Sequence, residues 1–96
     1  MLEQLTQAHF APLLNHVFNV DIDGAQLKLE LANVEALGPA WSGQRQPFSL
    51  LFRGPRDPLL PQRIYAVEHS GLGKLEIFLV PIGPDEHGQR YQAIFS

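Results

Sequence analysis

The chain has 96 residues, a formal net charge of −3 at pH 7 and no cysteine. This length fits one domain, residues 1–96, with a single hydrophobic core. The acidic balance argues against nucleic acid or an anionic membrane as a partner, and the missing cysteines exclude disulfides and cysteine-ligated metals. The absence of a basic leader and of an apolar run of about 20 residues predicts a cytoplasmic location.

The N-terminal residues 1–15 contain the one stretch that favours a helix. Thr6 suits the N-cap position, because its hydroxyl can accept a backbone N–H of the first turn. Pro12 disfavours helical geometry at Ala11, so a short helix followed by a second short turn is expected. The apolar residues of the segment would pack on one side or end of a sheet: Leu5, Phe10, Leu13 and Leu14.

The clearest local signal is a hairpin between residues 18 and 31. Two runs alternate apolar and polar residues on either side of Asp23-Gly24, which suits a type I′ turn because both positions need positive φ. With these two residues as the loop, the apolar side chains fall on one face. The expected pairs are Ile22 with Ala25, Val20 with Leu27 and Phe18 with Leu29. The alternation weakens near Asn33, which indicates a β-bulge.

The remaining strands follow at short intervals. The apolar patterns predict strands at Phe48–Arg53, Ile64–His69, Lys74–Val80 and Arg90–Phe95. Prolines stiffen the loop at residues 54–62, whose Leu59 and Leu60 are expected in the core. Six short strands and one short N-terminal helix predict a mainly β fold, in which an antiparallel sheet forms a small barrel or a sandwich.

One predicted strand has apolar residues on both faces. In residues 74–80, Phe78 and Val80 lie on the face opposite the core-facing leucines. This second face is therefore expected to be partly covered, either by the N-terminal helix or by a partner. Trp41, in the loop at residues 38–46, also has two readings: a lid over the core, which is favoured, or an exposed anchor for binding.

Four segments carry a family signature. They are LT-x-x-x-F-x-P-L at Leu5–Leu13, LLFRGPRDPLLPQ at Leu50–Gln62, EHSGLGKLEIFLVPIGPD at Glu68–Asp85 and RYQAIF at Arg90–Phe95. With these motifs the chain resembles a family of small uncharacterised bacterial domains over nearly its whole length. The resemblance implies a role in a phage-tail-like assembly, and it carries over no catalytic residue.

Reactive residues do not cluster in the sequence. The four histidines lack metal-ligand spacing: His9, His16, His69 and His87. No serine lies in a G-x-S-x-G motif. Glu68 points to the opposite face of its strand from His69, so a structural histidine near a turn is the favoured role of His69. The pattern predicts no cofactor and no metal.

Arginines flank the proline loop. Arg53, Arg56 and Arg63 could form a basic rim that grips an acidic partner. The favoured reading is structural: Arg53 would tie the loop down through its carbonyls or through Asp57, because a guanidinium suits both kinds of acceptor.

Three functions remain open. The first is a non-enzymatic structural or protein-interaction module that binds a protein, or a second copy of itself, through sheet edges and loops. The second is a small-ligand-binding barrel, with or without enzymatic activity, whose pocket would be lined by Trp41, Arg53, Tyr65 and His69. The third, a metal-dependent hydrolase, needs two histidines to meet a carboxylate and is least favoured. The residues expected at a contact surface or pocket are Trp41, Arg53, Arg56, Tyr65, His69 and Phe78.

Overall fold

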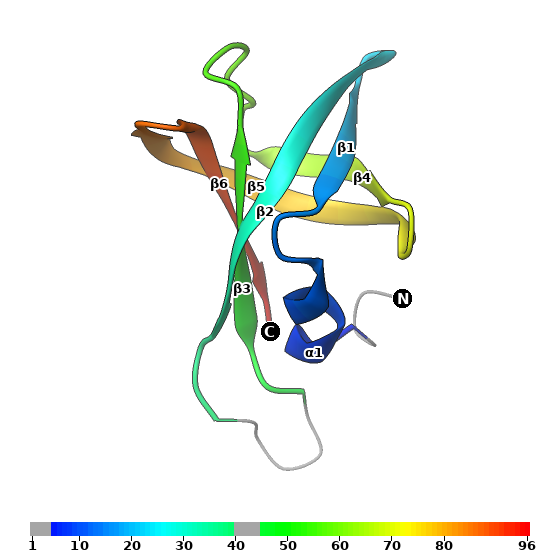
Figure 1. Ribbon diagram of the computed structural model, residues 1–96, viewed down its shortest axis with the longest axis vertical. Coiled ribbons are helices and arrows are strands. Elements are labelled where there is room, and N and C mark those ends of the chain that lie inside the picture. The colour runs from blue at the N-terminus through cyan, green and yellow to red at the C-terminus, as the bar shows by residue number, and fades with distance from the viewer. Residues whose placement is uncertain (1–4, 40–44) are drawn as a thin grey trace.

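The computed structural model describes residues 5–39 and 45–96. The elements are a short helix α1 (Gln7–Phe10), a 3-10 helix η2 (Ala11–Leu13) and the strands β1 (Val17–Ile22), β2 (Ala25–Ala36), β3 (Phe48–Gly54), β4 (Arg63–His69), β5 (Gly73–Asp85) and β6 (Gly88–Phe95). The strands are antiparallel and close into a barrel in the order β1-β2-β3-β6-β5-β4 (Figure 1). The mainly β prediction is confirmed, and the barrel is the correct choice over the sandwich.

The predicted hairpin register between β1 and β2 is confirmed. Asp23 and Gly24 form the loop with φ values of 51° and 89°, which is the positive region that a type I′ turn needs. The three expected pairs are all observed: Ile22 with Ala25, Val20 with Leu27 and Phe18 with Leu29. The bulge near Asn33 is also confirmed, because the register between β2 and β3 shifts between Leu31 and Asn33.

Strand β5 is longer than the sequence predicts. It continues past Val80, its predicted end, through Gly83 and Pro84 to Asp85, and a tight turn leads into β6. The pairing of β4 with β5 stops at Leu79, so Pro81 and Pro84 lie where β5 has a neighbour on one side only. A missing N–H therefore costs no ladder bond on the free side, which allows prolines inside this strand.

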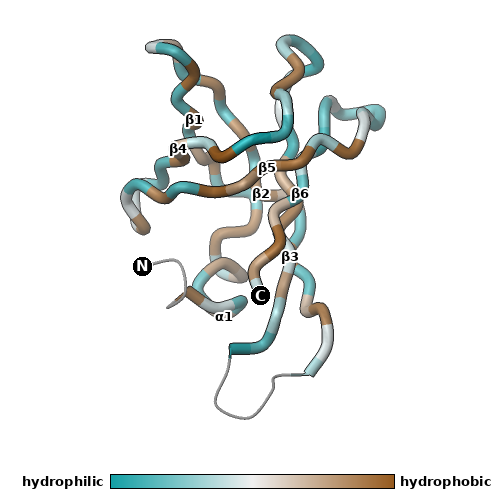
Figure 2. Tube along the Cα trace, turned by 180° about the vertical axis from the view of Figure 1, so that it is seen from behind, coloured by the Kyte–Doolittle hydropathy of each residue, from teal (hydrophilic) through white to brown (hydrophobic). Residues whose placement is uncertain are grey.

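The barrel interior is filled by apolar side chains. The core residues are Phe10, Phe18, Val20, Leu29, Leu31, Phe48, Leu50, Phe52, Leu60, Tyr65, Val67, Leu75, Ile77, Leu79, Tyr91, Ala93 and Phe95. Figure 2 shows hydrophobic and hydrophilic residues alternating along the strands, and a hydrophobic stretch of β6 ending beside α1. This alternation is what a closed antiparallel sheet with one buried face requires.

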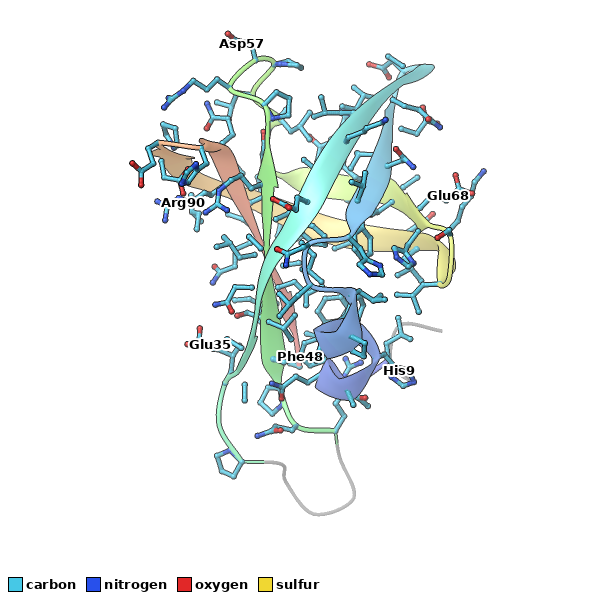
Figure 3. The ribbon with its side chains drawn as sticks, in the orientation of Figure 1. His9, Glu35, Phe48, Asp57, Glu68 and Arg90 are labelled. Atoms are coloured by element: carbon cyan, nitrogen blue, oxygen red, sulfur yellow. The ribbon has the colours of Figure 1, made fainter. Side chains whose placement is uncertain are left out.

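Helix α1 covers one end of the barrel. The Phe10 ring packs at centroid distances of 5.8 Å from Phe48 and 5.6 Å from Phe95, and Phe48 lies beside α1 in Figure 3. Leu5 and Leu13 pack partly against the core, whereas Leu14, expected beside them, is exposed. The helix therefore closes an open end of the barrel.

The proline loop places one of its two leucines inside. Leu60 is buried and its backbone N–H donates to the Tyr91 hydroxyl at 3.0 Å. Leu59 was also predicted in the core, but its side chain is 55% exposed. Because successive side chains of an extended segment point in opposite directions, only one of two adjacent leucines can face the core.

Candidate functional site

An apolar row crosses the outer surface of three neighbouring strands. Ile64 of β4 pairs with Phe78 of β5. Val80 pairs with Gln92, and Phe78 and Ile94, two residues away on each strand, line the same hollow. Their exposed fractions are 62% for Ile64, 48% for Phe78 and 63% for Ile94. We call these three residues the outer apolar row.

The outer apolar row lines a shallow hollow of about 440 Å³ at the surface. Glu76 and Arg45 also line it and supply charge. Single exposed apolar side chains are common on protein surfaces, but adjacent ones form a patch that favours burial against a partner. Burying what remains exposed would contribute on the order of 1 kcal/mol per side chain.

Arg45 links Leu5 to Ser96 near this hollow. Its Nη1 donates to the Leu5 carbonyl at 2.6 Å, and its Nη2 donates to the Ser96 carbonyl at 2.8 Å. Its guanidinium also lies 5.6 Å from the Phe48 ring centroid and 5.7 Å from that of Phe95. Arg45 therefore fixes the N-terminal segment against β3 and β6.

Arg53 and Arg56, two of the residues predicted at a site, converge on Asp85. The Arg53 Nη2 lies 2.8 Å from the Asp85 Oδ2, and the Arg56 Nη2 donates to the Asp85 carbonyl at 2.7 Å. The hydrogen bond from Arg53, followed by one from the His87 N–H, lowers the pKa of Asp85 to about 2. Arg53 has a structural contact, but the predicted partner is wrong: it binds Asp85 of β5 and not a group of the proline loop, and Asp57 lies at the outer tip of that loop (Figure 3).

Tyr65, also predicted to line a pocket, is a core residue. Its hydroxyl donates to the Pro61 carbonyl and its ring lies 4.9 Å from the Arg63 guanidinium. Burial raises the pKa of Tyr65, while the nearby charge of Arg63 acts in the opposite direction. These contacts tie the end of the proline loop to β4.

His69 is buried at the end of β4 and bonded on both ring nitrogens. Its Nδ1 accepts the backbone N–H groups of Gly71 at 2.9 Å and Leu72 at 3.3 Å. Its Nε2 lies 3.1 Å from the Nδ1 of His16. Burial, followed by the proximity of His16, lowers the pKa of His69. The role of a structural histidine near a turn fits this geometry.

The structure does not bring the predicted pocket residues together. Of three surface hollows of about 520, 440 and 300 Å³, Arg53 lines the first, and none is lined by Tyr65 or His69. Trp41 lies outside the described residues. Phe78, predicted at a contact surface or pocket, is about half exposed, and the exposed Ile64 and Ile94 were missed. Both could have been recognised in the sequence, because they alternate with the core-facing residues of their strands and so point outward.

The histidine pair is poorly suited to hold a metal ion. Because the Nδ1 of His69 accepts two N–H groups, its Nε2 carries the proton and has no lone pair to offer. Across residues 5–39 and 45–96, no three metal-ligating side chains lie grouped together. The described residues therefore give no support to the hydrolase hypothesis.

No helix in the described part of the chain is long and apolar enough to cross a membrane. A family model with the description "Domain of unknown function (DUF6916)" matches residues 5–95. No curated protein and no solved structure matches the chain.

Proposed function

The chain belongs to the DUF6916 family, and we propose that it is a non-enzymatic interaction module that binds a protein partner through the outer apolar row. The observation that carries this proposal is the adjacency of three exposed apolar side chains, Ile64, Phe78 and Ile94, on three hydrogen-bonded strands. A phage-tail-like assembly is the setting we propose for this partner.

The chain's own fold leaves the outer apolar row uncovered. The sequence allowed the N-terminal helix to lie over Phe78, but its buried residue, Phe10, packs on Phe48 and Phe95 at one end of the barrel. Phe78 remains about half exposed. Of the two covers expected for this face, a partner is the one that fits the geometry.

The barrel also favours one mode of contact over another. Edge pairing was expected as a route to association, but the sheet closes into a barrel. The part of β5 that has a neighbour on one side only carries Pro81 and Pro84, which have no N–H to donate to an added strand. A partner that contacts the side chains of a sheet face needs no free edge. Apolar side chains accompanied by a few polar groups, here Glu76 and Arg45, are the usual composition of such an interface.

A triple variant tests the proposal. Ile64→Ser, Phe78→Ser and Ile94→Ser together remove the apolar area and leave the inner face unchanged. Val17→Ser is the matched control, because Val17 is an apolar residue 49% exposed on the outer face of β1. Tagged proteins would be used to recover partners from cells that express the chain naturally, and circular dichroism would confirm that each variant is folded.

We expect at least a tenfold loss of recovered partner for the folded triple variant and no loss for Val17→Ser. Equal recovery by the wild-type protein and the triple variant would overturn the proposed surface. Recovery lost equally in both variants would also overturn it, since the effect would then not depend on the row.

A further inference from the structure

The barrel is closed by the pairing of β1 with β4. This is the shortest of its seams, the name we give to the pairing of two neighbouring strands. Only three residue pairs are formed there: Asn19 with Glu68, Val20 with Val67 and Asp21 with Ala66. The opposite seam, between β3 and β6, has seven pairs. The backbone pairing of β1 with β4 ends at Asn19 and Glu68. Beyond that end, the side chains of His16 and His69 form a hydrogen bond.

The hydrogen bonds fix where the protons of this pair reside. Nδ1 of His69 accepts the N–H groups of Gly71 and Leu72, so the proton of the neutral ring is on Nε2. Nε2–H therefore donates to Nδ1 of His16 across 3.1 Å. For this bond to exist, Nδ1 of His16 must be unprotonated.

Backbone hydrogen bonds to β2 hold His16 in position. Its carbonyl accepts the Leu31 N–H at 3.0 Å, and the neighbouring Asn15 N–H donates to the Leu31 carbonyl at 2.8 Å. The backbone of His16 is thus bonded to β2, while its side chain reaches β4 across the first residues of β1. The ring contact between His16 and His69 is stacked, with an interplanar angle of 16° and a centroid distance of 5.3 Å.

A proton on His16 converts the acceptor of this bond into a donor. Nδ1–H of His16 would then face Nε2–H of His69, and two donors repel each other. His69 cannot relieve the conflict by moving its proton to Nδ1, because that atom faces two backbone N–H groups. His16 is exposed and His69 is buried, so His16 is the ring that solvent protons reach.

The charged side chains on the strands around the pair are exposed to solvent. Glu30 of β2 pairs with Val17, the residue after His16, and is one of them. Phe18, whose ring centroid lies 4.7 Å from that of His69, is uncharged. Glu68 of β4 and Lys74 of β5 are cross-strand neighbours, and both are exposed on the outer surface. The His9 ring is bonded to the Thr6 N–H at 2.9 Å in the N-terminal helix.

We propose that His16 and His69 form an acid-sensitive latch, in which protonation of His16 breaks their hydrogen bond and opens the β1–β4 seam next to the β4–β5 turn. At neutral pH the hydrogen bond between the two histidines holds β1 and β4 together beyond the last backbone pair. In mild acid the end of β4 and residues 70–73 separate from the start of β1. The lowered pKa of His69 agrees with a ring held neutral in this state.

Amide hydrogen exchange measured by NMR at pH 7.5 and 5.5 tests the latch. The protection factors of Asn19, Gly71 and Leu72, corrected for intrinsic exchange, would be compared with that of Leu50 in the long β3–β6 seam. We expect the wild-type protein to lose at least tenfold in protection at the first three amides at pH 5.5 and to keep it at Leu50. Unchanged protection at all four amides would overturn the proposal.

Two variants separate the latch from other effects of acid. In His16→Gln, the side-chain oxygen can still accept from the His69 Nε2–H but takes up no proton in this range, so we expect protection at Gly71 and Leu72 to be independent of pH. His87→Gln is the matched control, since His87 is an exposed histidine on the turn before β6, and it should behave as the wild type. A full acid response in His16→Gln would refute the role of His16.

If His16→Gln does not fold, His69→Asn supplies the second test. The asparagine oxygen can accept the Gly71 and Leu72 N–H groups but is too short to reach His16. Protection of Asn19 should then be low at both pH values. Protection of Asn19 that stays high at pH 7.5 would show that the seam is closed without the pair, and the proposal would fail.

Discussion

Strands β4, β5 and β6 carry apolar side chains on the outer face as well as on the inner face, although the fold requires them only on the inner face. Three pairs of adjacent residues each place one apolar side chain in the core and one on the surface: Tyr65 and Ile64, Ile77 and Phe78, Ala93 and Ile94. The inner members fill the barrel, whereas the outer members contact solvent. An apolar residue inside stabilises the fold, whereas an exposed one adds little to its stability, and our proposal is that the outer apolar row serves binding.

The largest expected difference in the free energy of unfolding is between variants of Ile77 and of its neighbour Phe78. Ile77→Ala should lower the free energy of unfolding by about 2–5 kcal/mol, because it leaves a cavity in a filled core. Phe78→Ala should cost less than about 1 kcal/mol, since its side chain is half exposed. Urea unfolding of both variants measures the difference. Equal losses in the two variants would remove the distinction between the faces.

Two glycines allow the same comparison between a crowded and an open environment. A Cβ at Gly88 would approach the Gly54 carbonyl oxygen to 2.1 Å, and φ there is +136°, so Gly88→Ala should cost roughly 2–5 kcal/mol. A Cβ at Gly24 would meet nothing within 4 Å, so Gly24→Ala should cost only about 1–2 kcal/mol, from its φ of +89°. Thermal unfolding checks the order; a larger loss for Gly24→Ala would contradict it.

The Tyr91 hydroxyl on the inner face helps to anchor the proline loop. Tyr91→Phe removes the acceptor of the buried Leu60 N–H. An unsatisfied buried donor costs about 1–3 kcal/mol, so the variant should lose that much stability and expose residues 55–62 to proteolysis. Tyr65→Phe removes a donor to a carbonyl near the surface and should cost less. The proposal for Leu60 fails if Tyr91→Phe unfolds at the wild-type urea concentration.

The smallest effects concern pH. The folded-state pKa of Asp85, about 2, is below the unfolded value of 3.8, so the unfolded chain takes up this proton first. Its stabilising contribution is therefore present above pH 3.8 and is lost as pH falls through 3.8 to about 2. The lowered pKa of His69 has the same sign and gives a loss that begins as pH falls through about 6.5.

Asp85→Asn isolates the lower of these two windows. Unfolding by urea at a series of pH values should show a flatter profile below pH 4 for Asp85→Asn than for the wild-type protein. Parallel profiles below pH 4 would show that the contact between Arg53 and Asp85 does not stabilise the fold.

Local signals in the sequence predicted much of the barrel. Asp23-Gly24 determined a turn and its register because the constraint acts within a few residues. The end of β5 was not predicted, because Gly83 and Pro84 favour a loop unless one side of the strand lacks a neighbour. That absence depends on where β4 begins, which is a property of the tertiary structure.

The contacts at the candidate sites were harder to predict, because they join distant parts of the chain. Arg53 and Asp85 are 32 residues apart, and His16 and His69 are 53 apart. No spacing rule relates such residues before the strand order is known. Phe78 could be predicted as exposed from its own strand, but the outer apolar row becomes visible only when the register of three strands is known.

Site-specific photo-crosslinking tests the binding role of the outer apolar row most directly. A photoreactive phenylalanine analogue would replace Phe78 in one protein and Val17 in a control, and both would be irradiated in cells that express the chain naturally. We predict a discrete protein adduct from position 78 that is absent from position 17 and disappears when Ile64→Ser and Ile94→Ser are added. No adduct at position 78, or the same adducts at both positions, would contradict the proposal that this face binds a partner.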